Sequence, residues 1–128
     1  MNTTGSLFRL DSQVAIVTGA AKGIGAATAR ILVAQGARVA AVDSDEKGLR
    51  AVVAKLGDAA KSYVVDISDV EAGKQMVEST YKDFGRLDIL VNIAGICPRL
   101  PFSKSTPQDW ERLININAVG GGASARIR

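Results

Sequence analysis

The chain has 128 residues, a formal net charge of +3 and 47% hydrophobic residues. This length predicts one domain or part of one, because two separate cores would each be close to the smallest size that folds. The mixture of apolar and charged residues excludes wholesale disorder. Uninterrupted apolar runs reach only four residues, as in Val14-Ala15-Ile16-Val17, so we expect no transmembrane helix and no membrane partner.

Charged and sulfur-containing residues narrow the function classes further. Basic residues are scattered singly along the chain, which is typical of a solvated surface, so we expect no nucleic-acid partner. Residues 1–12 contain no basic start followed by an apolar stretch, and the single cysteine, Cys97, cannot form an internal disulfide. Both features indicate a cytoplasmic protein. With no histidine, we expect no metal site and no histidine-dependent nucleophile.

Four short segments rich in β-branched residues recur along the chain and predict strands at 14–17, 38–42, 62–65 and 88–91. These segments are nearly all apolar rather than alternating, which favours strands buried on both faces of a parallel sheet. A complete doubly wound dinucleotide-binding fold normally has about six parallel strands, so this chain has room for only part of one.

Helix-forming patterns follow the first two predicted strands. The first predicted helix stops at Gly36, which is expected to be its C-terminal cap. Its apolar residues keep helical spacing: Ile24, Ala27, Ile31 and Ala34. The second predicted helix ends at Gly57. Its apolar stripe contains Leu49, Val52, Val53 and Leu56.

Two further helices are predicted from their first turns. Ser68-Asp69-Val70-Glu71 has the pattern of a capping box, and Thr106-Pro107 predicts an N-cap followed by proline at the first helical position. The third helix is expected to turn four residues inward: Val70, Val77, Tyr81 and Phe84. The inner face of the fourth is expected to contain Trp110, Leu113, Ile114 and Asn117. Four strand–helix units predict an α/β fold, a Rossmann-type parallel sheet with flanking helices.

A glycine-rich segment, 18–25, directly follows the first predicted strand and opens the first helix. Glycine lets the backbone turn tightly and approach a pyrophosphate, and the new helix offers free N–H groups to that anion. The spacing is Gly-x-x-x-Gly-x-Gly, and no Gly-Lys-Ser/Thr ends it, so the segment is not a P-loop. An ordinary glycine-containing turn between strand and helix is the alternative.

Asp43 ends the second predicted strand, 18 residues after Gly25. A carboxylate at this place can accept hydrogen bonds from both hydroxyls of an adenosine ribose, and it would repel the additional phosphate of NADP. Asp43 therefore favours NAD, whereas the cation of Lys22 in the glycine turn favours NADP. The structural alternative is that Asp43 or Ser44 caps the next helix.

Together these features resemble the short-chain dehydrogenase/reductase family over about residues 10–120. The family's Thr-Gly-x-x-x-Gly-x-Gly pattern is matched in full, beginning at Thr18. By this resemblance Gly19, Gly23 and Gly25 form the pyrophosphate turn, and Ile24 contributes a backbone N–H.

The resemblance extends to residues after the third predicted strand and in the fourth helix. Asp66 and Ile67 match the family's acidic and aliphatic pair, which implies contact with the adenine ring. The spacing from Trp110 to Asn117 matches the family's pattern, which implies that Asn117 is the catalytic asparagine holding a water in the proton relay. Taken alone, Asp66 reads as a helix-entry residue, and Asn117 is equally compatible with a hydrogen-bonded structural amide.

The family's Asn-Asn-Ala-Gly motif is represented by Asn92-Ile93-Ala94-Gly95. Asn92, Ala94 and Gly95 are retained, which implies that they line the path of the cofactor. Ile93 replaces the second asparagine, so the hydrogen bonds of that side chain are absent. Asn92 by itself is also compatible with a plain amide at the end of a strand.

The family's chemistry is hydride transfer between a nicotinamide and an alcohol or ketone carbon, with a serine and a Tyr-x-x-x-Lys pair moving the proton. The only tyrosines are Tyr63 and Tyr81, and neither is followed by lysine four residues later. We therefore expect residues 1–128 to be a single NAD(P)-binding domain truncated before the catalytic pair, and inactive alone. In the complete enzyme the substrate would be a small secondary alcohol or ketone.

Two other interpretations remain. The chain is also compatible with a non-catalytic nucleotide-binding or interaction fragment that associates with itself or with a partner through an exposed sheet edge. A methyltransferase likewise places glycines after its first strand and an acid after its second. The Asn-x-Ala-Gly stretch and the spacing from Trp110 to Asn117 argue against the methyltransferase.

Overall fold

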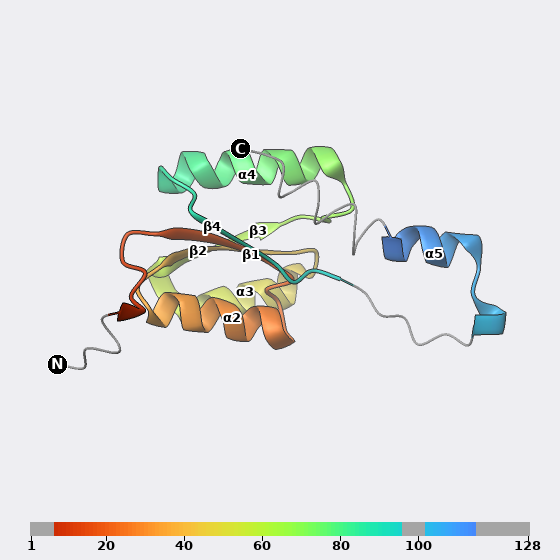
Figure 1. Ribbon diagram of the computed structural model, residues 1–128, viewed down its shortest axis with the longest axis horizontal. Coiled ribbons are helices and arrows are strands. Elements are labelled where there is room, and N and C mark those ends of the chain that lie inside the picture. The colour runs from red at the N-terminus through yellow and green to blue at the C-terminus, as the bar shows by residue number, and fades with distance from the viewer. Residues whose placement is uncertain (1–6, 96–101, 115–128) are drawn as a thin grey trace.

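A computed structural model describes residues 7–95 and 102–114 and shows a parallel sheet with helices on both faces (Figure 1). The strands are β1 (Val14–Thr18), β2 (Arg38–Asp43), β3 (Ala60–Val64) and β4 (Ile89–Asn92), in the order β3-β2-β1-β4. All three strand pairs are parallel. The order reverses between β1 and β4, and this is where open α/β sheets form a crevice at the carboxyl ends of their strands. The predicted Rossmann-type α/β fold is confirmed.

In the described part of the chain, the helices that connect or follow the strands are α2 (Gly23–Ala34), α3 (Glu46–Leu56), α4 (Val70–Phe84) and α5 (Pro107–Ile114). Two 3-10 turns, η1 (Gly57–Ala59) and η2 (Phe102–Lys104), accompany them. In Figure 1, α2 and α3 cover one face of the sheet, α4 covers the other, and α5 lies beyond the carboxyl ends of the strands. Among the helices of the described residues, none is long and apolar enough to cross a membrane.

The sheet is most deeply buried at its centre. All five residues of β1 are buried, and in β2 only Arg38 and Asp43, at the two ends, are not. Burial on both faces was expected for all four strands, but the two outer strands are only partly buried: in β3 only Ala60 is buried, and in β4 residues 89–91 are half-buried. An edge strand has a neighbour on one side only, which leaves more of its surface exposed. The third strand also begins at Ala60, two residues before the predicted start.

The face of α2 that contacts the sheet is made of small residues. Gly25, Ala26 and Ala29 are its buried residues, whereas Ile24 and Ile31 are 75% and 63% exposed. Apolar spacing therefore predicted the helix correctly but not its buried face. Small residues let the helix backbone approach the sheet closely, so the larger isoleucines are turned outward. The C-cap of α2 is Gln35, so the cap predicted at Gly36 was wrong by one residue; Gly36 follows it with φ +97°.

The first turn of α4 begins one residue later than predicted. Asp69 is the N-cap, and its carboxylate accepts the N–H of Ala72 at 3.1 Å. The hydroxyl and the N–H of Ser68 both donate to Asp66 instead. The capping-box prediction at Ser68 was therefore wrong by one position.

The inward face of α4 also differs from the prediction. Val77 is buried and Phe84 half-buried, as expected, but Val70 and Tyr81 are 50% and 61% exposed. The buried residues are Gly73, Met76, Val77 and Thr80. These four residues form the face of α4 that packs on the sheet, and Val70 and Tyr81 lie outside it.

The first turn of α5 agrees with the sequence. The hydroxyl oxygen of Thr106 accepts the N–H of Asp109 at 3.2 Å, and the Asp109 carboxylate accepts the N–H of Thr106 at 2.8 Å. The predicted inner face is wrong at Trp110 and Ile114, which are 47% and 53% exposed, because α5 does not pack on the sheet (Figure 1). The side chain of Leu113 and all of Asn117 lie outside the described residues.

Candidate functional site

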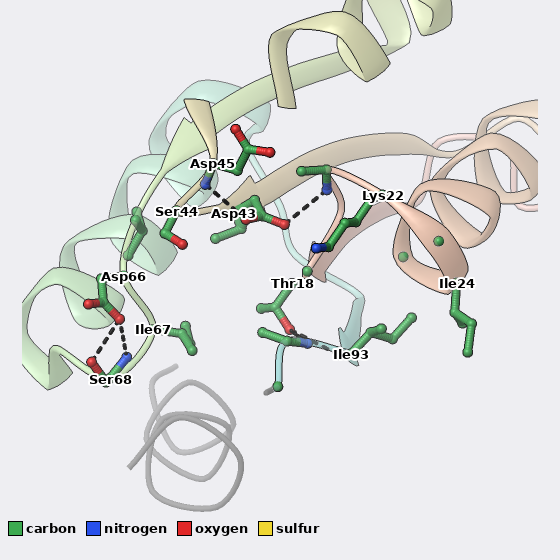
Figure 2. A pocket seen from close by; sticks show the side chains of 18 of the residues that line it. Thr18, Lys22, Ile24, Asp43, Ser44, Asp45, Asp66, Ile67, Ser68 and Ile93 are labelled. Carbon is green, nitrogen blue, oxygen red and sulfur yellow. Dashed lines mark hydrogen bonds between the residues drawn. The ribbon is translucent and has the colours of Figure 1, made fainter. Parts of the chain in front are cut away.

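A cavity of about 680 Å³ opens where the strands end, between the glycine turn after β1 and the loops after the other three strands (Figure 2). Arg112, in α5, also lines it. This volume is within the range of about 300–1,000 Å³ that is usual for small-molecule sites. Every residue predicted to bind the cofactor lines the cavity except Asn92, which ends β4 and is exposed. The predicted catalytic residue, Asn117, lies outside the described residues.

The glycine turn is packed directly against the loop after β4. Gly19 has φ +70°, and a Cβ atom there would lie 2.8 Å from the backbone nitrogen of Ala94. A Cβ atom on Gly25 would overlap the carbonyl oxygen of Gly19. Both neighbours are backbone atoms and cannot rotate away. These two positions therefore require glycine because of close backbone approach, and the first also because of its conformation.

Thr18 joins the glycine turn to the same loop. Its side chain is buried, and its hydroxyl oxygen accepts the N–H groups of Ile93 at 3.0 Å and Ala94 at 3.1 Å. The hydroxyl donates to the carbonyl of Val91 at 3.5 Å. One side chain at the end of β1 thus holds the backbone after β4, although the partners are 75 and 76 residues apart in the chain.

Asp43 is fixed on the cavity wall by two backbone N–H groups. One carboxylate oxygen accepts from Ala21, in the glycine turn, at 3.0 Å, and the other accepts from Asp45 at 2.9 Å (Figure 2). The N-cap of α3 is Asp45, whose carboxylate accepts the N–H of Gly48 at 3.1 Å. The alternative that Asp43 or Ser44 caps α3 was therefore wrong, and Asp43 has no capping task.

Asp66 forms the wall near the end of β3. Its Oδ1 atom accepts the hydroxyl of Ser68 at 2.7 Å and the N–H of Ser68 at 3.0 Å. These hydrogen bonds, with a smaller contribution from the charge of Arg112, lower the pKa of the Asp66 carboxyl below its ordinary value. Ile67 is buried beside it. Asp66 is not the N-cap of α4, because Asp69 takes that position.

Neither tyrosine is placed at the cavity. Tyr63, on β3, donates its hydroxyl to Asp83 at 2.6 Å, and Tyr81 lies exposed on α4. Burial, and then the hydrogen bond to Asp83, raise the pKa of Tyr63. An acid/base tyrosine needs a pKa closer to neutrality, so the described residues contain no tyrosine suited to proton transfer at this cavity. Within the same residues no group of acidic, cysteine or histidine side chains is arranged to hold a metal ion.

Several cavity residues were not found from the sequence. Ser68 holds Asp66, Ile93 lines the cavity where the family motif has asparagine, and Arg112 reaches it from α5. The Asp66-Ile-Ser spacing could have indicated the turn in which the Asp66 carboxylate accepts the N–H of Ser68. No local signal distinguishes Arg112 from other arginines on helix surfaces, because its position depends on where α5 lies.

Comparison with known proteins identifies the family. The family model described as short chain dehydrogenase matches residues 13–122. The chain belongs to the short-chain dehydrogenase/reductase family. D-threitol dehydrogenase of Mycolicibacterium smegmatis is 42% identical over 116 residues, which are 88% of this chain and 45% of that enzyme. The chain spans about half the length of the curated relatives that it matches.

Solved structures agree with this assignment. The 3-ketoacyl-(acyl-carrier-protein) reductase of Brucella melitensis, complexed with NADH, has a TM-score of 0.88 and 35% identity, covering 91% of this chain and 49% of the reductase. A short chain dehydrogenase of Mycobacterium paratuberculosis, bound to NAD, has a TM-score of 0.85 and 29% identity, covering 91% and 49%. This chain is therefore a member of an oxidoreductase family with the fold of its nicotinamide-binding structures.

Proposed function

We propose that residues 1–128 form a single cofactor-binding domain of an NAD-dependent oxidoreductase that acts on a small secondary alcohol or ketone. The observation that carries this proposal is the Asp43 carboxylate, which Ala21 and Asp45 hold on the cavity wall beside the glycine turn. A carboxylate held in this way accepts two ribose hydroxyls without reorganising.

The glycine turn fits the pyrophosphate of the cofactor. A side chain at Gly19 would fill the space between this turn and the β4 loop, and one at Gly25 would overlap the turn itself, so their absence lets backbone N–H groups face the cavity. The first turn of α2 has N–H groups without partners inside the helix, which include that of Ile24 beside Gly23. These donors and the positive end of the helix dipole stabilise a bound diphosphate.

Residues after β3 and β4 would hold the two rings of the cofactor. Asp66 accepts from the adenine amino group, and Ile67 packs against the ring. Ala94 and Gly95 line the path toward the nicotinamide, which when bound supplies or accepts the hydride. Asn92, at the end of β4, shapes this path through the backbone.

The catalytic part of the proposal rests on resemblance. By this resemblance Asn117 would hold a water that takes part in the proton relay. Because neither tyrosine of this chain has lysine four residues later, we expect no NAD reduction by the 128-residue chain with a panel of secondary alcohols. Sustained turnover by the pure chain would contradict this part alone.

Cofactor preference has two opposing charges. Asp43 repels the 2′-phosphate of NADP, whereas the exposed Lys22 lines the same cavity and attracts it. Asp43 has the larger effect on the affinity for NADP. Beside the doubly charged 2′-phosphate its carboxylate would lose water and gain no hydrogen-bond donor in return. We therefore propose NAD as the cofactor.

Isothermal titration of the 128-residue chain with NAD and NADP tests this function. We expect a micromolar dissociation constant for NAD and binding of NADP at least about tenfold weaker. Equal affinity would contradict the NAD preference but keep the nicotinamide cofactor. Absence of binding to both dinucleotides would reject the cofactor-binding function.

A second candidate is favoured by the edge of the sheet. In β4, residues 89–91 are apolar and only half-buried, and among the described residues no strand pairs on the outer side of β4. Such an edge favours a non-catalytic fragment that associates with another chain or with itself. Sedimentation measurements test this: a concentration-dependent dimer without NAD binding would support the second candidate over the first.

A further inference from the structure

Arg112 is a cavity residue for which the cofactor-binding proposal has no role. It lies in α5, beyond the carboxyl ends of the strands (Figure 1), and it is exposed where it lines the cavity. The two acidic groups on which its charge acts are Asp66 and Asp109. Asp109 is in the same helix as Arg112 and accepts the N–H and the hydroxyl of Thr106. Asp66 is distant in the chain and lies in the loop after β3.

The charges of Arg112 and Asp66 influence each other without contact. Within the described residues no ion pair or hydrogen bond joins them, so the guanidinium and the carboxylate are more than 4.0 Å apart. Asp66 cannot swing freely toward the arginine, because Ser68 holds its Oδ1 atom with two hydrogen bonds. A cation and an anchored anion therefore both line the cavity without forming an ion pair with each other.

We propose that Arg112 is a specificity residue for the adenine half of the cofactor, its guanidinium lying against the face of the ring whose amino group Asp66 accepts. The inference rests on the proposed function and names one more residue of that site. A guanidinium is planar and weakly hydrated, and it stacks on aromatic faces, including those of nucleobases. Its charge also favours the ionised Asp66 carboxylate, which is the form that accepts a hydrogen bond from an amino group.

The two halves of NAD should therefore depend on Arg112 differently. ADP-ribose contains the adenine, both phosphates and both riboses, so it makes the proposed contact. Nicotinamide mononucleotide lacks the adenine and does not. A change in the general charge of the cavity would weaken both ligands, because both contain phosphate.

The test compares Arg112→Leu, Arg112→Lys and the control Arg30→Leu. Arg30 is an exposed arginine of α2 that does not line the cavity. In calorimetric titrations of the 128-residue chain, we expect Arg112→Leu to weaken NAD and ADP-ribose by the same factor, about 3- to 10-fold. NMR titration with nicotinamide mononucleotide should give an unchanged affinity. Arg112→Lys keeps the charge but loses the plane, so its loss should be intermediate.

The outcomes separate the inference from the function on which it rests. If the unsubstituted chain binds NAD and Arg112→Leu binds ADP-ribose equally well, the inference is overturned and the function stands. Equal losses in Arg112→Leu and Arg30→Leu also overturn it, because they indicate a general charge effect. If the unsubstituted chain binds neither dinucleotide, both are overturned. Circular dichroism of each variant verifies the fold. We expect the fold to be kept, because the Arg112 side chain is exposed and forms no hydrogen bond with the described residues.

Discussion

The two ends of the cavity differ in whether backbone or side-chain atoms form their walls. At the glycine turn the walls are backbone atoms, and Thr18 and Gly25 are buried. At the end near β3 and α5 the walls are side chains, and Asp66 and Arg112 are exposed. The residues of the first end are packed into the core around the sheet, whereas those of the second lie at its surface. Substitutions at the first end should therefore alter folding as well as binding, whereas those at the second should alter binding with only a small effect on stability.

The largest effect is expected at Gly25. A Cβ atom there would overlap the carbonyl oxygen of Gly19, so Gly25→Ala should lower the free energy of unfolding by about 3 kcal/mol or more. Gly23→Ala is the matched control, because a Cβ atom at Gly23 meets nothing within 4 Å, although φ is +57°. The control should cost about 1 kcal/mol. Urea unfolding measures both, and equal losses would show that the backbone does not pack here as described.

The next effect concerns the bridge between β1 and the β4 loop. Thr18→Val leaves the N–H groups of Ile93 and Ala94 without their acceptor, which should cost about 2 kcal/mol of unfolding free energy. Thr80→Val is the control: Thr80 is equally buried, but its hydroxyl donates at 2.9 Å to Met76 in its own helix. That carbonyl keeps its helical hydrogen bond, so the control should lose less than half as much. Similar losses for the two variants would remove the special role of Thr18.

Asp43 stands between the two ends, and its substitution should change selectivity more than stability. Asp43→Asn removes the charge that repels the 2′-phosphate and weakens the acceptor for the ribose hydroxyls. NAD should bind about tenfold more weakly, and the preference for NAD over NADP should decrease. Asp58→Asn, in η1 and outside the cavity, changes the same charge and should leave both affinities unaltered. Calorimetry with both dinucleotides measures the ratio, and an unchanged ratio in Asp43→Asn would contradict the assignment.

The smallest effect is the contribution of Asp66 to the pH dependence of stability. Its pKa lies below the ordinary 3.8, first because of Ser68 and then because of Arg112. The stability that the charged form contributes is therefore complete above the unfolded pKa and is lost as the pH falls through the lower folded pKa. Asp66→Asn should flatten the decrease in unfolding free energy between about pH 5 and pH 3 slightly, since the group is exposed. A decrease as steep as that of the unsubstituted chain would show no contribution.

Most of the fold was predictable because it follows from local signals. Continuous apolar segments predicted β1 and β2 nearly to the residue, and Thr106 began α5 as expected. The predictions that were wrong concern helix caps and buried faces rather than the existence of elements. Ile31 and Tyr81 are apolar or aromatic at helical spacing, yet they are exposed, because the buried face of a helix depends on what it packs against.

The candidate site was predictable to a similar degree. The glycine spacing and the acid at the end of β2 indicated a nucleotide-binding edge, since the carboxyl ends of parallel strands converge there. The support of that site was not predictable. Ala21 and Ser68 hold the two carboxylates by hydrogen bonds, and such contacts are decided by backbone geometry that spacing alone does not specify.

The sequence by itself determined the order of strands and helices, the glycine turn and the acids after β2 and β3, because periodicity and turn chemistry act over a few residues. Only the tertiary structure decided that Thr18 holds the backbone after β4, which faces of α2 and α4 are buried, and that Arg112 lines the cavity. Each of these depends on segments distant in the chain meeting in space. The physical reason is that a local pattern specifies an element, whereas packing specifies its neighbours.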